Sequence, residues 1–190
     1  RAPPRDQHQS TDGHERAADI YQQVARRRHE AGDTDNAIAA LRKALHAVHG
    51  HPESSDLLEE VLYAAGRTSD LDLYYRERVA EAQSPEERMD FLFKRAQLAE
   101  GDLGDPAEAL RVYEEIVSIE PPGGPASQRL AELYLANQDY AKFAELREKQ
   151  IEVAQDPQFR LQILTDLAAV YRDRLGDPDR CAVYLHAILQ

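Results

Sequence analysis

The sequence predicts an all-α protein, an α-solenoid of about five helical hairpins that contain ten antiparallel helices. Apolar residues recur at helical spacing through almost the whole chain, and short segments rich in glycine, proline or aspartate separate them. The corner inside each hairpin recurs at intervals of 34, 38, 34 and 38 residues, at Gly32, Gly66, Gly104, Gln138 and Gly176. A fixed period of this size is typical of stacked helical repeats.

Residues 104–121 show the pattern of a single helix most completely. Asp105 can cap the first turn, Pro106 suits the first helical position, and Pro121 ends the run. The apolar residues between these ends lie at helical spacing: Ala109, Leu110, Val112, Tyr113, Ile116 and Val117. Because one neighbour cannot bury so wide a stripe, we expect a helix on either side of this one.

The first part of the chain begins with residues 1–14, which contain two prolines and no apolar periodicity. We expect a flexible tail there. A first hairpin is expected at about residues 15–51 and a second at about residues 52–84, because each contains two amphipathic runs around a glycine corner. Gly50 and Pro52 end the first hairpin.

Three more hairpins are expected at about residues 85–122, 123–155 and 156–190. Ser84, followed three residues later by Glu87, starts the third in the manner of a capping box. The segment 121–125 is rich in proline and glycine, and we interpret it as a loop rather than an interdomain linker because the helical pattern resumes beyond it.

The alternating intervals imply a larger unit of 72 residues, and single residues recur at that offset. Leu103-Gly104-Asp105-Pro106 returns as Leu175-Gly176-Asp177-Pro178. Small residues at Ala25, Ala96, Ala131 and Ala168 would let the two helices of a hairpin approach closely. We therefore expect an arginine at Ala25 or Ala168 to destabilise the fold strongly.

The units resemble tetratricopeptide repeats over about residues 15–190. The segments that carry the resemblance are Leu164-x-x-Leu167-Ala168-x-x-Tyr171 with Cys181-x-x-x-Leu185, Tyr21-x-x-Val24-Ala25 with Ala37-x-x-x-Leu41, and Ala109-x-x-x-Tyr113 with Pro121. Phe143 and Leu71 depart from the pattern, because each stands where the family has alanine. The resemblance implies a right-handed superhelix whose concave surface is lined by the first helix of each hairpin, and a protein or peptide as the partner.

Composition restricts the classes of partner. The net charge of −12 argues against nucleic acid, which is bound through clustered lysine and arginine, and favours a basic surface on a protein partner. No run approaches eighteen apolar residues, so membrane insertion is not expected, and the cytoplasm is the favoured location. The single cysteine, Cys181, is expected in the core.

The sequence shows no motif specific for catalysis. A glycine-rich phosphate loop, a His-Glu-x-x-His segment and a Cys-x-x-Cys segment are all missing, so we expect neither catalytic residues nor a cofactor, and the chain is not predicted to be an enzyme. His46, His49 and His51, with Glu53 nearby, form the one cluster that could hold a metal. Because histidines are also favoured at helix C-termini, no metal site is predicted.

Partner contacts are expected on the first helix of each hairpin, away from its packing stripe. By spacing, the candidates are Gln22, Arg26, His29, Glu60, Tyr63, Phe93, Gln97, Gln128, Glu132, Leu135 and Arg172. The favoured function is a protein- or peptide-binding scaffold, as one segment of a longer repeat array. Two alternatives stay open: a structural module that associates with itself through exposed terminal helices, and a regulatory repeat domain of a larger protein.

Overall fold

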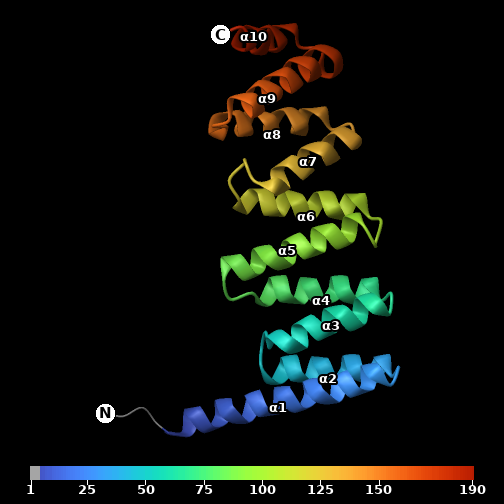
Figure 1. Cartoon of the computed structure of the whole chain (residues 1–190). Coiled ribbons are helices and arrows are strands. Elements are labelled where there is room, and N and C mark those ends of the chain that lie inside the picture. The colour runs from blue at the N-terminus through green and yellow to red at the C-terminus, as the bar shows by residue number, and fades with distance from the viewer. Residues whose placement is uncertain (1–4) are drawn as a thin grey trace. The chain divides into compact units, whose positions relative to one another are not determined.

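The structure, a computed structural model, describes the backbone of residues 5–190 and the side chains from residue 11 onward (Figure 1). The described residues form ten α-helices and one π-helical turn, and no strand is found among them. The elements are α1 (Arg5–Glu30), α2 (Thr34–Ala47), α3 (Pro52–Ala64), α4 (Thr68–Glu81), α5 (Pro85–Glu100), α6 (Pro106–Ile119), α7 (Pro125–Ala136), α8 (Tyr140–Val153), α9 (Pro157–Val170), η1 (Tyr171–Leu175) and α10 (Pro178–Ile188). The predicted all-α helical-repeat architecture is confirmed.

Each hairpin has its corner at a residue in the left-handed backbone region. Gly32, Gly66, Gly104 and Gly176 have φ angles of 75°, 64°, 59° and 65°, and Gln138 has a φ angle of 61°. Glycine adopts this region without steric cost, which explains its recurrence at the corners. Gln138 is the one corner residue that carries a side chain in this backbone conformation.

The starts of α5 and α6 are formed as predicted, whereas α3 begins at Pro52, a few residues before the Ser55 or Asp56 that the sequence suggested. Ser84 Oγ accepts a hydrogen bond from the Glu87 backbone N–H at 3.0 Å, and Asp105 Oδ1 accepts one from the Glu108 backbone N–H at 3.0 Å. Both bonds satisfy donors that the first helical turn leaves open. The segment between Ile119 and Pro125 connects α6 to α7.

Two local features differ from the sequence-based expectation. The helix α1 begins at Arg5, so residues 5–14 are helical where a flexible tail was predicted, and residues 1–4 lie outside the described part. This stretch is almost entirely polar, and apolar periodicity detects only those helices that bury a face. The first helix of the last hairpin ends in the π-helical turn η1, where the repeat pattern has one residue more than in the preceding hairpin.

The contacts divide the chain inside α4 into two compact units, Arg1–Tyr74 and Tyr75–Gln190, which are described separately. In the first unit, α1 packs on α2, and both contact α3. Its core consists of small and branched side chains that are almost completely buried: Ala25, Ala37, Leu41, Leu58, Val61 and Leu62.

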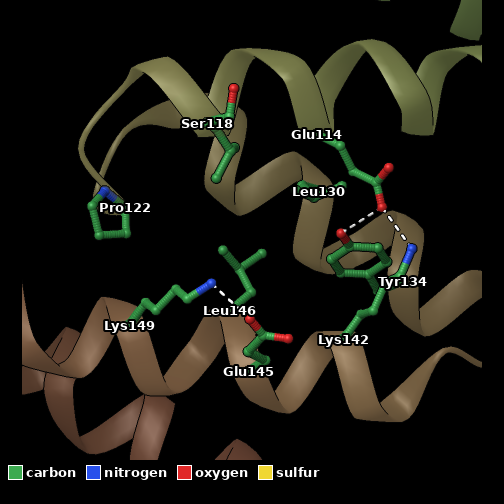
Figure 2. A pocket seen from close by; sticks show the side chains of 10 residues that line it. Glu114, Ser118, Pro122, Leu130, Tyr134, Lys142, Glu145, Leu146 and Lys149 are labelled. Atoms are coloured by element: carbon green, nitrogen blue, oxygen red, sulfur yellow. Dashed lines mark hydrogen bonds and ion pairs between the residues drawn. The ribbon is translucent and has the colours of Figure 1, made fainter.

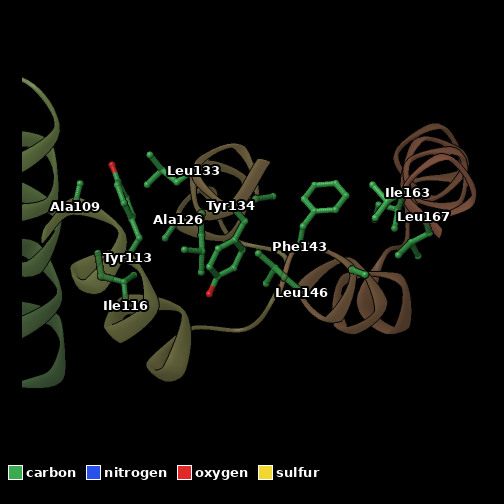
Figure 3. Close-up of a cluster of buried hydrophobic side chains, with 14 of the residues drawn as sticks. Ala109, Tyr113, Ile116, Ala126, Leu133, Tyr134, Phe143, Leu146, Ile163 and Leu167 are labelled. Carbon is green, nitrogen blue, oxygen red and sulfur yellow. The ribbon is translucent and has the colours of Figure 1, made fainter. Parts of the chain in front are cut away.

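The second unit has a continuous core that runs from α5 to α10. Figure 3 shows its middle part, where Tyr113 and Ile116 of α6 lie beside Ala126 of α7, and Phe143 of α8 lies toward Ile163 of α9. Cys181 is buried in this core, as expected. Each helix from α6 to α9 thus packs against the helix before it and the helix after it. Among the described helices, none is both long and apolar enough to cross a bilayer.

Candidate functional site

The second unit contains a groove between its second helices α6 and α8, with the first helix α7 at the bottom (Figure 2). Its volume is about 340 Å³. We call it the α6–α8 groove, and its lining residues are Glu114, Val117, Ser118, Pro122, Leu130, Tyr134, Lys142, Glu145, Leu146 and Lys149.

The floor of the α6–α8 groove is apolar. Leu130 and Leu146 are buried and belong to the core of the unit, and Val117 is half-buried beside them. At one edge of the groove, the side chain of Ser118 is short, and its hydroxyl donates a hydrogen bond to the Glu115 carbonyl at 2.6 Å. This edge of the groove is therefore low. The floor of the groove therefore lies on the edge of the core, where Leu130 and Leu146 are 2% and 5% exposed.

One end of the groove has a fixed polar network. Glu114 Oε1 accepts hydrogen bonds from the Tyr134 hydroxyl at 2.9 Å and from Lys142 Nζ at 2.8 Å. Burial, reinforced by the Glu114 carboxylate, raises the pKa of Tyr134 well above its ordinary value. The same carboxylate raises the pKa of Lys142. These residues join three helices and hold this end of the groove in place.

The other end carries an exposed ion pair within α8. Lys149 Nζ lies 2.7 Å from Glu145 Oε1, and the two side chains are 60% and 66% exposed. The hydrogen bond from Lys149 lowers the pKa of Glu145. An exposed pair of this kind contributes little to stability, so both side chains can turn toward a bound molecule at small cost.

A related network recurs between α8 and α10. Glu148 Oε1 accepts hydrogen bonds from Tyr171 at 2.8 Å, Tyr184 at 2.7 Å and Arg180 at 3.2 Å. The hollow beside it is lined by Glu148, Ile151, Glu152, Arg180 and Tyr184. It lacks the leucine floor of the α6–α8 groove, so it is less suited to an apolar side chain.

The eleven predicted contact residues are divided between the two units. Those in the first unit are Gln22, Arg26, His29, Glu60 and Tyr63, and those in the second are Phe93, Gln97, Gln128, Glu132, Leu135 and Arg172. Gln22, His29 and Phe93 are half-buried and the other eight are exposed. None of the eleven lines the α6–α8 groove.

Within the second unit, Leu135 alone of the predicted residues lines a hollow among those described. It is 41% exposed and borders a space of about 370 Å³ together with Tyr140, Ala169, Val170, Asp173 and Arg174. Arg174 lies over the Tyr140 ring, 5.2 Å from its centroid. We call this hollow, together with the exposed side of α7, the first-helix face.

Other predicted residues of the first-helix face are engaged within the chain. Glu132 forms an ion pair with Arg129, and Arg172 Nε lies 2.7 Å from Asp173 Oδ1. Gln128 Oε1 accepts from the buried Arg147 at 3.5 Å.

Behind Gln128, Arg147 NH2 lies 3.3 Å from Asp166 Oδ2. Burial lowers the pKa of Arg147 and raises that of Asp166. Sequence reasoning did not find this buried pair, because α8 and α9 contribute one partner each and no local pattern joins them.

The histidines of the sequence cluster do not share one site. His51 is buried at the start of α3, where Nδ1 lies 2.9 Å from Ser54 Oγ and Nε2 lies 3.4 Å from Asp19 Oδ1 of α1. His46 and His49 are exposed. In the part of the chain searched, no group of three or more His, Cys, Asp or Glu side chains is arranged to hold a metal ion.

Comparisons with known proteins agree with this architecture. Residues 102–167 match a family model described as tetratricopeptide repeat. A tetratricopeptide repeat protein from Parabacteroides merdae is similar in structure, with a TM-score of 0.51, 18% identity, and coverage of 92% of this chain and 66% of that one.

Two further solved structures have lower scores. MamA from Desulfovibrio magneticus has a TM-score of 0.47, 15% identity, and coverage of 91% and 93%. YrrB, titled a TPR protein with an unusual peptide-binding site, has a TM-score of 0.48, 12% identity, and coverage of 89% and 83%. No curated protein sequence matches the chain. Residues 102–167 are thus similar to tetratricopeptide repeat sequence, and the chain has a helical-repeat fold similar to that of the tetratricopeptide repeat protein from Parabacteroides merdae.

Proposed function

We propose that this tetratricopeptide-like chain is a protein- or peptide-binding scaffold, and that its α6–α8 groove receives an apolar side chain of the partner. One observation carries the proposal: the buried leucines Leu130 and Leu146 form the floor of a groove that is open to solvent. Exposed apolar residues are common on protein surfaces when they stand alone. A hollow with a core surface at its floor is less common and favours a ligand.

The size of the groove fits part of a polypeptide. A volume of about 340 Å³ lies near the lower limit of small-molecule pockets, and it accommodates one or two side chains. Burying one leucine or isoleucine on this floor would contribute roughly 1.5–3 kcal/mol. Glu145 and Lys149 at the rim can then pair with charges of the partner, because they are exposed and bound only to each other in the described contacts.

The two ends of the α6–α8 groove differ in how firmly their side chains are held. Glu114, Tyr134 and Lys142 hold a fixed geometry, so they present a preorganised wall. Lys149 and Glu145 can adjust their positions. The net charge of −12 supports a partner with a basic surface around its apolar anchor.

The first-helix face is a second candidate surface, because the family resemblance implies partner contacts on first helices. The observation that favours it is Leu135, which is 41% exposed at the edge of the hollow with Tyr140 and Val170. An apolar side chain of a partner would contact these apolar residues. The two hollows share no lining residue, so single substitutions separate them.

The test is selection of peptides from a phage-displayed library of random dodecapeptides on the purified chain, followed by affinity measurement by calorimetry. Ser118→Arg places a long side chain in the groove, whereas Ile119→Arg adds the same charge one residue away at a side chain that is 46% exposed and does not line it. We expect Ser118→Arg to weaken binding at least about tenfold, which corresponds to about 1.4 kcal/mol, and Ile119→Arg to leave it unchanged.

Leu135→Glu is the matched variant for the first-helix face. If it alone abolishes peptide binding, the partner lies on that face and the groove assignment is wrong. If the library yields no peptide that binds the chain, the scaffold proposal itself fails.

A further inference from the structure

The hollow that Glu148 lines between α8 and α10 is the counterpart of the α6–α8 groove one hairpin later, and we call it the α8–α10 hollow. Positions in the second helices are counted from the corner residue before each helix, which is Gly104 for α6, Gln138 for α8 and Gly176 for α10. Glu114 and Glu148 are each the tenth residue after their corner, and each lines its own hollow. The two hollows can therefore be compared position by position.

One wall is built in the same way in both hollows. Lys142 and Arg180 are each the fourth residue after their corner. Lys142 Nζ lies 2.8 Å from Glu114 Oε1, and Arg180 NH1 lies 3.2 Å from Glu148 Oε1. An ion pair thus links neighbouring second helices at the same place, and each of these carboxylates already has a cation beside it.

The rest of the lining differs between the two hollows. The fourteenth position is Ser118 in the α6–α8 groove and Glu152 in the α8–α10 hollow. The eighth position is Leu146 in the groove and Tyr184 in the hollow. A short hydroxyl and an aliphatic side chain are thus replaced by a carboxylate and an aromatic ring, while Ile151 keeps one aliphatic surface in the hollow.

The feature that distinguishes the α8–α10 hollow is the carboxylate of Glu152. This side chain is exposed, and no hydrogen bond or ion pair engages it in the part of the chain that the structure describes. In the α6–α8 groove Lys149, the eleventh residue after its corner, pairs with Glu145. The eleventh residue after Gly176 is Ala187, so α10 has no cation at this position.

The two arginines at and beside this hollow are engaged with other groups. Arg180 lines the hollow, but its guanidinium pairs with Glu148. Arg160 NH1 donates a hydrogen bond to the Ile151 carbonyl at 2.8 Å, and Arg160 does not line the hollow. The negative charge of Glu152 is therefore available to a partner.

We infer that the α8–α10 hollow binds a basic side chain, of lysine or arginine, from the same partner that inserts an apolar side chain into the α6–α8 groove. The aliphatic stem of the basic residue would lie against Ile151 and the ring of Tyr184, and its charge would pair with Glu152. The hollow has a volume of about 380 Å³, which accommodates one long side chain. The inference rests on the function proposed for the groove, and it specifies a second residue that the partner contributes.

The helix α8 sets the distance between the two bound side chains. It lines the groove with Glu145 and Lys149 and the hollow with Glu148 and Glu152, so the partner must cross one helix between them. A helix with its side chains is roughly 10–12 Å wide, and an extended chain advances about 3.3 Å per residue. We therefore expect the basic residue at least about three positions from the apolar residue.

The test uses dodecapeptides selected on the purified chain, restricted to those whose affinity Ser118→Arg lowers. Glu152→Gln removes the charge and keeps the size of the side chain. Asp179→Asn is the control, because it removes one negative charge from an exposed residue of α10 that does not line the hollow. By calorimetry at about 50 mM salt, we expect Glu152→Gln to weaken binding about fivefold and Asp179→Asn to leave it unchanged. At about 500 mM salt the difference between Glu152→Gln and the original chain should decrease.

A peptide variant identifies the group that Glu152 recognises. Replacing the basic residue of the peptide by glutamine should weaken binding to the original chain, and Glu152→Gln should then cause no further loss. Additive losses would overturn the inference, because they would show that the basic residue binds elsewhere.

The outcomes separate this inference from the groove assignment. Equal affinity of the original and Glu152→Gln chains for peptides that respond to Ser118→Arg would overturn the inference alone and leave the groove assignment standing. Selected peptides without a basic residue would have the same meaning. If no peptide responds to Ser118→Arg, the groove assignment fails and this inference fails with it. Circular dichroism melting of each variant verifies that the fold is retained.

Discussion

Tyr134 and Glu114 link neighbouring hairpins of the second unit through a hydrogen bond of 2.9 Å from the phenolic hydroxyl to the carboxylate. Tyr134 belongs to α7 and Glu114 to α6, and Lys142 of α8 contacts the same carboxylate oxygen at 2.8 Å. Tyr171 and Glu148 repeat the arrangement one hairpin later at 2.8 Å. The hydrogen bonds to Glu114 therefore join neighbouring hairpins and also form one wall of the α6–α8 groove.

Replacing Tyr134 by phenylalanine should keep the ring packing and remove the hydrogen bond. We expect a loss of about 1 kcal/mol in the free energy of unfolding, measured by urea denaturation, because Glu114 retains Lys142 as a partner. Tyr171→Phe is the matched control. The Tyr171 hydroxyl also accepts a hydrogen bond from Arg180. The effect of its removal should still be smaller, because Glu148 keeps Tyr184 and Arg180 as donors and Arg180 keeps Glu148 as an acceptor. Equal losses for both variants would contradict this account of the network.

Stability should fall in alkaline solution through the buried tyrosines. Burial first, and then the neighbouring carboxylates, raise the pKa of Tyr134 and Tyr184 above the ordinary value of 10.0. The unfolded chain therefore loses these protons at a lower pH than the folded chain does, so their contribution is complete below about pH 10 and decreases as the pH rises further.

Unfolding free energies at pH 9 and pH 11, with absorbance titration of the phenolate, measure this effect. The double variant Tyr134→Phe, Tyr184→Phe should show a smaller decrease between the two pH values than the original chain. An identical decrease would mean that other groups dominate the alkaline response.

The corner residue Gln138 offers a stabilising substitution. Its φ angle of 61° lies in the left-handed region, which costs a residue with a side chain roughly 1–2 kcal/mol. Gln138→Gly should relieve most of this cost, less the greater freedom of glycine in the unfolded chain, and stabilise the protein by up to about 1 kcal/mol.

Gly104→Ala is the reciprocal change. Its φ angle is 59°, and an added Cβ would meet nothing within 4 Å, so the backbone alone determines the effect. We expect a loss of about 1 kcal/mol in the unfolding free energy measured in the same denaturant series. A destabilising Gln138→Gly would refute the explanation by backbone strain.

The close approach of helices in the last hairpin depends on Ala168. This residue is 5% exposed and belongs to the core of the second unit. Ala168→Arg should destabilise the fold by about 3 kcal/mol or more through overpacking and burial of charge. Thr165→Arg, at an exposed position of the same helix, should change the melting temperature very little. Unchanged melting of the Ala168 variant would contradict the packing described for α9.

Local chemistry explains which parts of the fold were predictable. Asp105 with Pro106, Ser84 with Glu87, and the corner glycines act within a few residues of one another, so the helix starts and the hairpin corners could be read from the sequence. The helical residues 5–14 were missed because a polar helix has no apolar period.

The candidate surface was less accessible to sequence reasoning. The resemblance to tetratricopeptide repeats directs attention to first helices, but the groove lies between the second helices α6 and α8. It forms because Ser118 is short at one edge while Leu130 and Leu146 meet at the floor from different helices. Such an opening depends on side-chain sizes across three helices, which periodicity within one helix does not report.

The π-helical turn at Tyr171–Leu175 has a consequence for how such a chain tolerates changes in length. Tyr134 lies four residues before the corner residue Gln138, and Tyr171 lies five residues before the corner residue Gly176. Both hydroxyls nevertheless donate a hydrogen bond to a glutamate of the preceding hairpin. The widened turn takes up the inserted residue after Tyr171, so the insertion shifts nothing upstream of it. A hairpin of this chain can therefore contain one more residue at this point and keep the hydrogen bond that connects it to the preceding hairpin.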